Sequence, residues 1–238
     1  MRGSALKLVA ADLRLVARDP LLAIMPIAPF LAAVALRFVL PPLSGFVERA
    51  TGFRIMDYAD VARVVITLFP GMFFGMVSGF LLLDDRDDGV SMYWGVTPVG
   101  RAGYLAARLG LFSVAAFVAA LAAARISGFG AVILIRDIGV AAIGSLQVAF
   151  FSLFLAAFAA NKVEGLALLK AMSGLDMAPL AVYLRLPIRL VAWPFPQYWA
   201  AEFALGRHAP PSGALSLGVL ASVMWIFFLA AKYRKRVD

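Results

Sequence analysis

Residues 61–83 read VARVVITLFPGMFFGMVSGFLLL, and residues 84–89, which follow directly, read DDRDDG. The hydrocarbon core of a bilayer is about 30 Å thick, and an α-helix needs about 20 apolar residues to cross it. The first stretch meets this requirement with one charged residue, Arg63, near its start. The stretch therefore predicts a membrane-spanning helix that ends in an acidic segment outside the membrane.

The composition of the whole chain agrees with a membrane protein. The 238 residues are 63% hydrophobic and 15% charged, with a mean hydropathy of +0.91, whereas soluble domains are about 45–50% apolar and about 25% charged. A soluble chain of this length could not bury so much apolar surface in one core. The lack of cysteine and the single histidine, His208, argue against disulfides, thiolate sites and histidine-cluster metal sites, so we expect no bound metal.

Further apolar stretches predict an all-α membrane protein in which residues 1–238 form a single transmembrane domain. Glycines inside these stretches do not argue against helices, because tight helix packing in lipid tolerates them. The six predicted spans cover residues 21–40, 61–83, 104–124, 138–160, 166–186 and 214–231.

Residues 1–19 predict an amphipathic helix that lies in the headgroup plane before the first span. Apolar residues recur there at helical spacing, and basic residues fall on another face: Leu6, Val9, Leu13 and Val16 against Lys7, Arg14 and Arg18. The alternative is a short solvated helix. Asp19-Pro20 marks a corner into the first span.

Lysine and arginine predict the orientation of the chain in the membrane. They are more numerous on the side that holds the N-terminus, and every lysine lies on that side. We therefore expect both termini in the cytoplasm. The net charge of +8 then suits anionic lipid headgroups rather than nucleic acid.

No enzyme signature is present in the sequence. The chain lacks a G-x-x-x-x-G-K-[ST] phosphate-binding loop, an H-E-x-x-H motif and a G-x-S-x-G motif. An intramembrane enzyme using Asp176 is an alternative, but such an enzyme needs a second ionisable group at the same depth. We therefore expect a protein that is not an enzyme.

Residues 84–100 predict a cytoplasmic loop suited to docking a soluble partner. Charges can set the register of docking, and apolar side chains can act as anchors in a pocket. The alternative is a solvated loop whose aromatic residues rest at the membrane interface. The candidate docking residues are Asp85, Arg86, Asp87, Asp88, Gly89, Met92 and Tyr93.

The chain resembles the ABC-2 type transporter permease family. The resemblance rests on the basic N-terminal helix, the Arg18-Asp19-Pro20 corner, six spans, and Asp85-Arg86-Asp87 with Gly89 after span two, followed by Thr97-Pro98. In this family the corresponding loop reads Glu-Arg-Glu-x-Gly-Thr, so aspartate replaces glutamate here and Val90 stands near the usual threonine. Residues 161–165 also resemble small bacterial drug-export permeases.

The resemblance implies a mechanism in which two permease chains pair and separate ATPase subunits dock on the loop between spans two and three. ATP and Mg²⁺ then belong to the ATPase partner, and this chain needs no cofactor of its own. The implied function is export of a small hydrophobic or amphipathic compound. Alternatives are a lipid or glycan flippase of the same architecture, and a scaffold or immunity module without transport.

Glycines and aromatic residues in span two predict a packing face and a substrate path. Gly71, Gly75 and Gly79 are four residues apart and form a ridge that another helix can approach closely. The candidate path residues are soft apolar side chains and one acid, with core filling as the alternative role: Phe69, Phe73, Met76, Phe80, Met172 and Asp176.

The last part of the chain predicts two irregular features. Ser173 and Asp176 have capping-box spacing, so span five is expected to break there and start a second half-helix. Prolines and aromatic residues in 187–213 predict a short re-entrant helical hairpin at the outer surface. His208, in the tail of this hairpin, is expected to be solvated.

Overall fold

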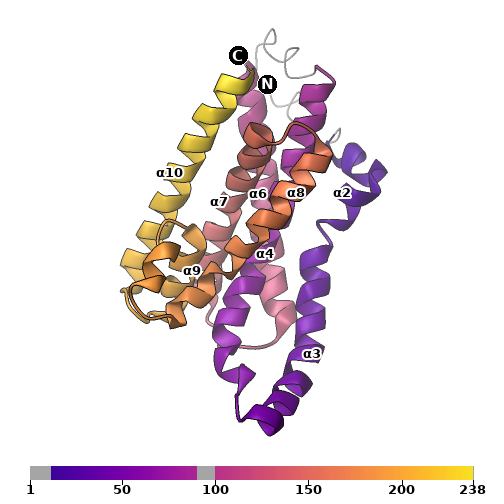
Figure 1. The fold of residues 1–238 in the computed structure, drawn as a ribbon. Helices are drawn as coiled ribbons and strands as arrows, with labels where there is room; N and C mark the ends of the chain where they lie inside the picture. The colour runs from indigo at the N-terminus through magenta and orange to yellow at the C-terminus, as the bar shows by residue number, and fades with distance from the viewer. Residues whose placement is uncertain (1–11, 90–99, 238) are drawn as a thin grey trace.

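The computed structural model describes residues 12–89 and 100–237, and in these ranges the chain forms helices and no strands (Figure 1). A short helical turn at residues 12–18 precedes the first named element. The elements are α2 (Pro20–Ile24), α3 (Ala28–Thr51), η1 (Ile55–Tyr58), α4 (Ala59–Asp87), α6 (Gly100–Ser127), α7 (Leu134–Phe158), α8 (Lys162–Met172), η2 (Ser173–Tyr183), η3 (Ile188–Ala192), α9 (Pro196–Leu205) and α10 (Pro211–Val237).

Six helical stretches within the described residues are long and apolar enough to cross a membrane, which confirms the predicted number of spans. We call the end of the bundle at which α10 finishes the terminal end, and the opposite end the distal end. Residues 12–18, the end of α4 and the starts of α6 and α8 all lie at the terminal end (Figure 1). The chain is therefore a multi-pass membrane protein.

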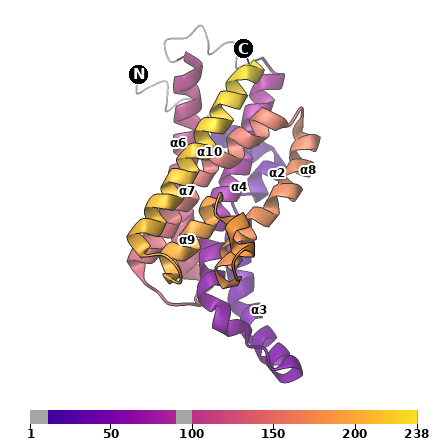
Figure 2. The same ribbon diagram turned by 60° about the vertical axis from the view of Figure 1, so that its left-hand side comes forward.

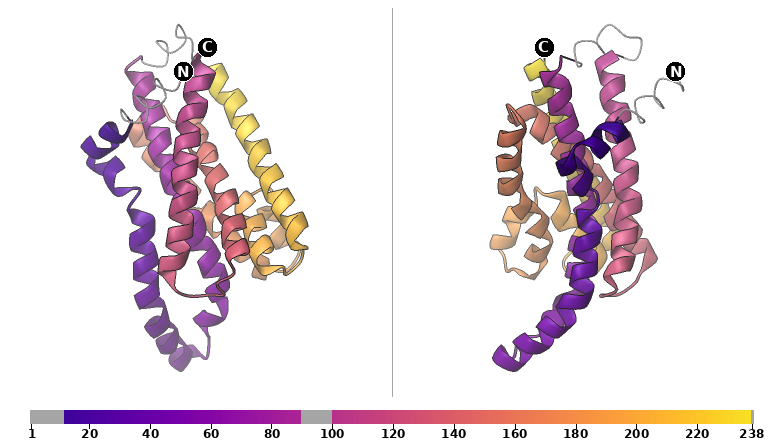
Figure 3. Two further views of the ribbon diagram at one scale, coloured as in Figure 1. Left: turned by 180° about the vertical axis from the view of Figure 1, so that it is seen from behind. Right: turned by 90° about the vertical axis from the view of Figure 1, so that its right-hand side faces the viewer.

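The predicted ends of the first span were wrong. The prediction was 21–40, but the continuous helix covers Ala28–Thr51. Pro26 lacks the N–H that a helix interior requires, so the short α2 ends before it and a new helix starts after a turn. Pro41 and Pro42 lie inside α3 rather than ending it. Figure 3 shows α3 leaning away from the bundle toward its distal end.

Helix α4 forms the centre of the bundle. In its most apolar window 83% of the residues are buried, against 11% for α3 and 28% for the last span. It packs on α6 and α7, while α10 lies along α7 and α9 (Figure 2). The outer faces of α3, α6 and α10 expose large apolar side chains such as Phe38, Val114 and Phe227. These faces suit contact with lipid or with another membrane protein.

The glycine ridge of α4 lies against α7. A Cβ added to Gly75 would lie 2.8 Å from the Cβ of Phe151, and one added to Gly79 would lie 2.7 Å from a methyl group of Leu155. A Cβ on Gly71 would overlap the carbonyl of Gly144. The two helices are therefore closer than any side chain at these positions would allow.

Span five changes its helix type where a break was expected. The α-helix α8 ends at Met172, and the chain continues as the 3-10 helix η2 to Tyr183. The predicted capping box is not formed, since the Ser173 hydroxyl donates to the carbonyl of Lys170 at 2.8 Å. The 3-10 turn explains this, because it continues the helix without the extended cap residue that a capping box requires.

The docking loop starts later in the chain than expected, whereas short helices occupy the predicted position of the outer hairpin. Helix α4 continues to Asp87, so the acidic residues that were expected to open a loop at 84 are largely helical. Between η2 and the last span, the chain forms η3 and α9 at the distal half of the bundle. These two short helices lie where the hairpin of residues 187–213 was predicted.

Candidate functional site

Three consecutive charged residues at the terminal end of α4 each hold a different segment. Asp84 lies 2.9 Å from the ammonium of Lys162 at the start of α8. Asp85 accepts hydrogen bonds from Tyr104 and Arg108 of α6. Arg86 donates to the carbonyls of Ala159 at 3.2 Å and Ala160 at 2.6 Å, between α7 and α8. The end of α4 therefore joins α6, α7 and α8.

The N-terminal segment joins the same network through two aspartates. Asp12 receives both Nε, at 3.0 Å, and a terminal nitrogen of Arg108. Asp19 lies 3.0 Å from Lys162 and also accepts from the N–H of Leu21 at the start of α2. The hydrogen bond from Lys162 holds the pKa of Asp19 below its usual range, although partial burial opposes this.

We call these seven residues the terminal cluster: Asp12, Asp19, Asp84, Asp85, Arg86, Arg108 and Lys162. Each of its two central cations, Arg108 and Lys162, is shared between one carboxylate of the N-terminal segment and one carboxylate of α4. Arg108, Asp12 and Asp85 are buried. Removing one partner from a buried ion network is costly, because it leaves the other charge without compensation. The cluster thus fixes the N-terminal segment to α4.

The terminal cluster changes the interpretation of the predicted docking residues, because two of them bind within the chain. The side chains of Asp85 and Arg86 bind groups inside the chain, so they are not presented outward as expected for an exposed loop. The side chain of Asp87 is 53% exposed, and Asp88 and Gly89 end the helix. Met92 and Tyr93 lie outside the described residues. A docking role for this region stays a prediction.

Sequence reasoning missed Arg108 and Lys162 as members of this site. An arginine within an apolar span signals a carboxylate partner, because a lone charge at that depth is expensive. Lys162 stands at the start of α8, and the start of this helix can be located from nearby residues. Asn161 accepts from the N–H of Glu164 at 2.9 Å, and Glu164 accepts from the N–H of Ala160 at 2.6 Å. This is a capping arrangement that the sequence spacing allows one to predict.

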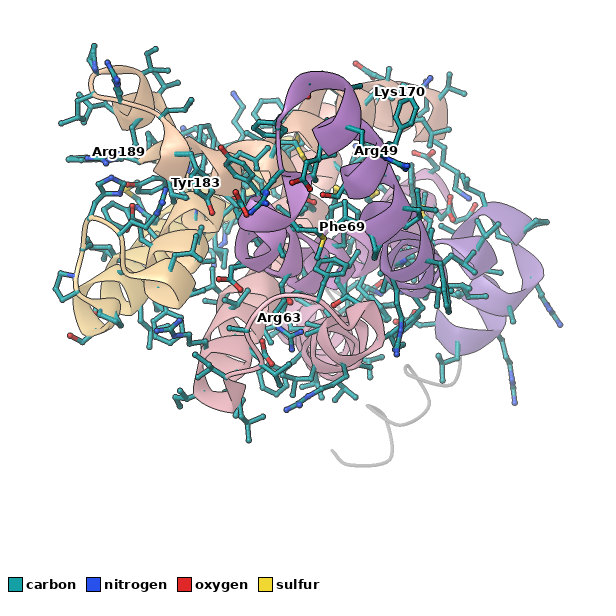
Figure 4. All side chains as sticks on the ribbon, turned by 90° about the horizontal axis from the view of Figure 1, so that it is seen from below. Arg49, Arg63, Phe69, Lys170, Tyr183 and Arg189 are labelled. Atoms are coloured by element: carbon teal, nitrogen blue, oxygen red, sulfur yellow. The ribbon has the colours of Figure 1, made fainter. Side chains whose placement is uncertain are left out.

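A second buried ion pair lies toward the distal end. Arg63 binds both oxygens of Asp137, at 2.9 and 2.8 Å, and donates to the carbonyl of Phe129 at 3.1 Å. Figure 4 looks along the bundle and shows Arg63 beside the pink α6–α7 segments. A cavity of about 20 Å³ beside the pair is lined in part by Asp60 and Arg136. It is large enough for one water molecule and too small for a drug.

The predicted path residues of α4 and α8 divide between two core clusters, which the ring contact of Phe69 with Phe73 at 6.2 Å connects. Met76, Phe80 and Met172 are buried together in the main core cluster, with Phe73 packed against it. Phe69 packs instead on a smaller cluster that includes residues of α3 and α6. In this conformation they fill the core, and a role in a substrate path stays a prediction. Asp176 is also buried, but neither of its oxygens has a hydrogen-bond partner.

His208 is not simply solvated, contrary to expectation. Its Nδ1 lies 2.7 Å from the carboxylate of Glu202, and its backbone N–H donates to the same carboxylate at 2.9 Å. The hydroxyl of Tyr198 donates to Glu202 at 2.8 Å. Burial opposes ionisation of Glu202, but the bonds from His208 and Tyr198 lower its pKa overall. Burial and the bond to Glu202 raise the pKa of Tyr198 to about 12.

Comparisons with known proteins identify a family and two relatives that resemble this chain. Residues 12–230 match the family described as fluoroquinolones export permease protein Rv2686c-like. Two curated proteins of Mycobacterium tuberculosis, the fluoroquinolones export permease proteins Rv2686c of strain H37Rv and MT2760 of strain CDC 1551, are each 30% identical over 199 residues, which is 80% of this chain and 77% of theirs. No solved structure matches the chain. With a family match that spans nearly all of its described helices, the chain belongs to the Rv2686c-like permease family of membrane transport proteins.

Proposed function

We propose that the chain is the membrane permease subunit of an ATP-binding cassette exporter that moves a hydrophobic or amphipathic drug out of a bacterial cell. The observation that carries this proposal is the family match over residues 12–230 together with six apolar helices. The mycobacterial relatives are named for fluoroquinolone export, and this compound class is the first substrate to test.

We propose that the terminal end of the bundle faces the cytoplasm and receives the force of a separate ATPase. The basic end of α10, with Arg234, Lys235 and Arg236 in its last turn, supports this orientation through the positive-inside rule. Asp87, whose carboxylate is exposed, lies in the segment that the family resemblance assigns to docking. The terminal cluster supports the proposal physically, because a push on the end of α4 would reach α6, α8 and the N-terminal segment through ion pairs.

A second permease chain is part of the same proposal. The outer faces of α3, α6 and α10 leave enough apolar surface for both lipid and a partner chain. The intramembrane-enzyme alternative has lost its support, because the relatives of this chain are transport proteins and the polar neighbour named for Asp176 is the amide of Gln197 rather than a second acid.

The proposal is tested by purifying the tagged chain from bacterial membranes and identifying the proteins that accompany it. We expect an ATPase subunit, and we expect the double variant Asp87→Ala/Asp88→Ala, which removes two exposed residues and leaves Arg86 in place, to reach the membrane but to lose that subunit. Asp57→Ala, which removes an exposed carboxylate at the distal end, serves as the matched control. Normal ATP-driven export by the double variant would contradict the docking role.

A further inference from the structure

Asp176 differs from every other buried carboxylate in the described part of the chain. Asp12 and Asp85 bind Arg108, Asp137 binds Arg63, and Glu202 binds His208 and Tyr198. Asp176 is 1% exposed, and its polar neighbour, the amide of Gln197, lies outside good hydrogen-bond geometry, so neither oxygen has a full hydrogen-bond partner. Buried polar groups in native proteins almost always have a partner, so an unpartnered acid calls for a ligand that the protein alone does not supply.

The group that faces Asp176 is also unsatisfied. The amide of Gln197, in the first turn of α9, is the neighbouring polar side chain, and both its oxygen and its nitrogen lack a hydrogen-bond partner. Gln197 is itself 1% exposed. The two side chains come from η2 and α9, which pack on each other. In this conformation the amide acts as a donor toward the carboxylate, and a half-turn of the amide would instead offer its oxygen as an acceptor beside the single negative charge.

This set of acceptors fits a small organic cation better than a metal ion. Ca²⁺ takes about six to eight oxygen ligands and Mg²⁺ needs near-octahedral coordination, which one acid and one amide do not provide. The described residues contain no group of three or more acidic or histidine side chains that could hold a metal. An ammonium group carries one charge and N–H donors, and it can bind the carboxylate and the amide oxygen together.

The surroundings suit the apolar remainder of such a cation. The elements that carry Asp176 and Gln197 also carry apolar residues: Met172 and Leu175 belong to or pack on the main core cluster, and Val182 of η2 and Phe203 of α9 belong to a second cluster. Methionine and phenylalanine side chains repack around varied shapes. Drug-binding sites commonly combine such an apolar lining with a few polar groups that fix the orientation of the ligand.

The helix type at Asp176 gives a route by which the site can open. The 3-10 helix η2 extends over 11 residues, whereas 3-10 runs longer than about four residues are uncommon and often mark functional hinges. Conversion of part of η2 to α-helix would turn Asp176 relative to α9, because the two helix types differ in residues per turn.

We propose that Asp176 and Gln197 receive the protonated amine of the exported compound, so that the transporter selects amphipathic molecules that carry a protonated amine over those that lack one. This inference rests on the proposed export function and adds the chemical class of the substrate. Asp176 supplies the charge, and Gln197 is the residue that orients the ammonium group.

The test compares two probes that differ in one charge. Norfloxacin carries a basic piperazine amine, and its N-acetyl derivative is neutral at that position. In inside-out vesicles containing the chain and its ATPase, we expect Asp176→Asn to lower kcat/KM for norfloxacin at least about tenfold and to leave the acetylated probe within about twofold of wild type. Asp176→Glu should retain most norfloxacin transport, and Asp57→Asn, on the surface, should change neither rate.

Two results would overturn the inference: an equal fall for both probes, which marks a structural acid, or no change in the norfloxacin rate, even if its pH dependence is altered. If the wild-type chain exports neither probe, the proposed function fails, and equilibrium binding to the purified chain decides the site separately. Weaker binding of norfloxacin alone in Asp176→Asn supports the site, and equal binding in variant and wild type refutes it.

Discussion

The close approach of α4 and α7 predicts a measurable cost for adding one methyl group at Gly75. In Gly75→Ala the new Cβ would lie 2.8 Å from the Cβ of Phe151 and 3.1 Å from the carbonyl oxygen of Val148. Ordinary contacts between carbon atoms are about 3.5–4.0 Å. Because both neighbours are backbone or attached directly to it, the two helices must move apart by several tenths of an ångström.

The size of the effect follows from two opposing contributions. Overpacking of a tight interface costs about 1–3 kcal/mol, while replacing glycine by alanine inside a helix favours folding by up to about 1 kcal/mol. Gly110, in α6, has no atom within 4 Å of an added Cβ, so Gly110→Ala measures the second contribution alone. We expect Gly75→Ala to be less stable than Gly110→Ala by about 1–3 kcal/mol.

The assay is unfolding of the purified chain in mixed micelles with increasing SDS, followed by loss of helical signal. Gly75→Leu should have a larger effect than Gly75→Ala, because its side chain cannot fit between the helices at all. A difference below about 0.5 kcal/mol between Gly75→Ala and Gly110→Ala would refute the close packing described here.

Four further outcomes follow from the polar contacts. Arg108→Met should destabilise the chain by about 3–5 kcal/mol, since it leaves two buried carboxylates unpaired, and the folded yield in detergent should fall. Lys162→Ala removes a cation that is one-third exposed, so stability should change by less than about 1 kcal/mol, while drug-stimulated ATP hydrolysis should fall if the cluster transmits force. Asp137→Asn should cost about 3–5 kcal/mol and lower the unfolding temperature. Glu202 has a lowered pKa, so the stability that its ionised carboxylate gives the fold is full above its ordinary pKa of 4.5 and is lost as the pH falls through the lower value in the folded chain. Glu202→Gln should abolish this loss of stability in acid. A dependence of stability on pH that is unchanged in the variant would contradict the role of His208.

The apolar pattern was enough to predict six spans, because the length requirement of a bilayer is local in the sequence. The ends of the spans were less predictable. Helix α4 continues through Asp84 and Asp85 because their partners neutralise them, and those partners lie in other helices: Arg108 is 23 positions after Asp85, and Lys162, the partner of Asp84, begins α8. Hydropathy does not contain such pairings.

The packing partner of the glycine ridge also could not be predicted from the sequence. The spacing of glycines at every fourth residue predicts a close helix contact, but the spacing does not identify α7 as the neighbour. For span five, the residues around Ser173 predicted a break and missed the 3-10 geometry, because periods of 3.0 and 3.6 residues differ little over one or two turns. The partner of His208 was missed because Glu202 lies only six positions earlier, in α9, and the left-handed turn at Gly206 that brings the two together leaves no mark in the hydropathy pattern.

The central claim, that this chain is a permease driven by a separate ATPase, is tested most directly by ATP-driven uptake of a fluoroquinolone into inside-out vesicles. Vesicles with the purified chain alone should show no ATP-dependent uptake, and adding the ATPase that accompanies it in the membrane should restore uptake. ATP-powered transport by the chain alone, or no transport with the ATPase present, would contradict the account.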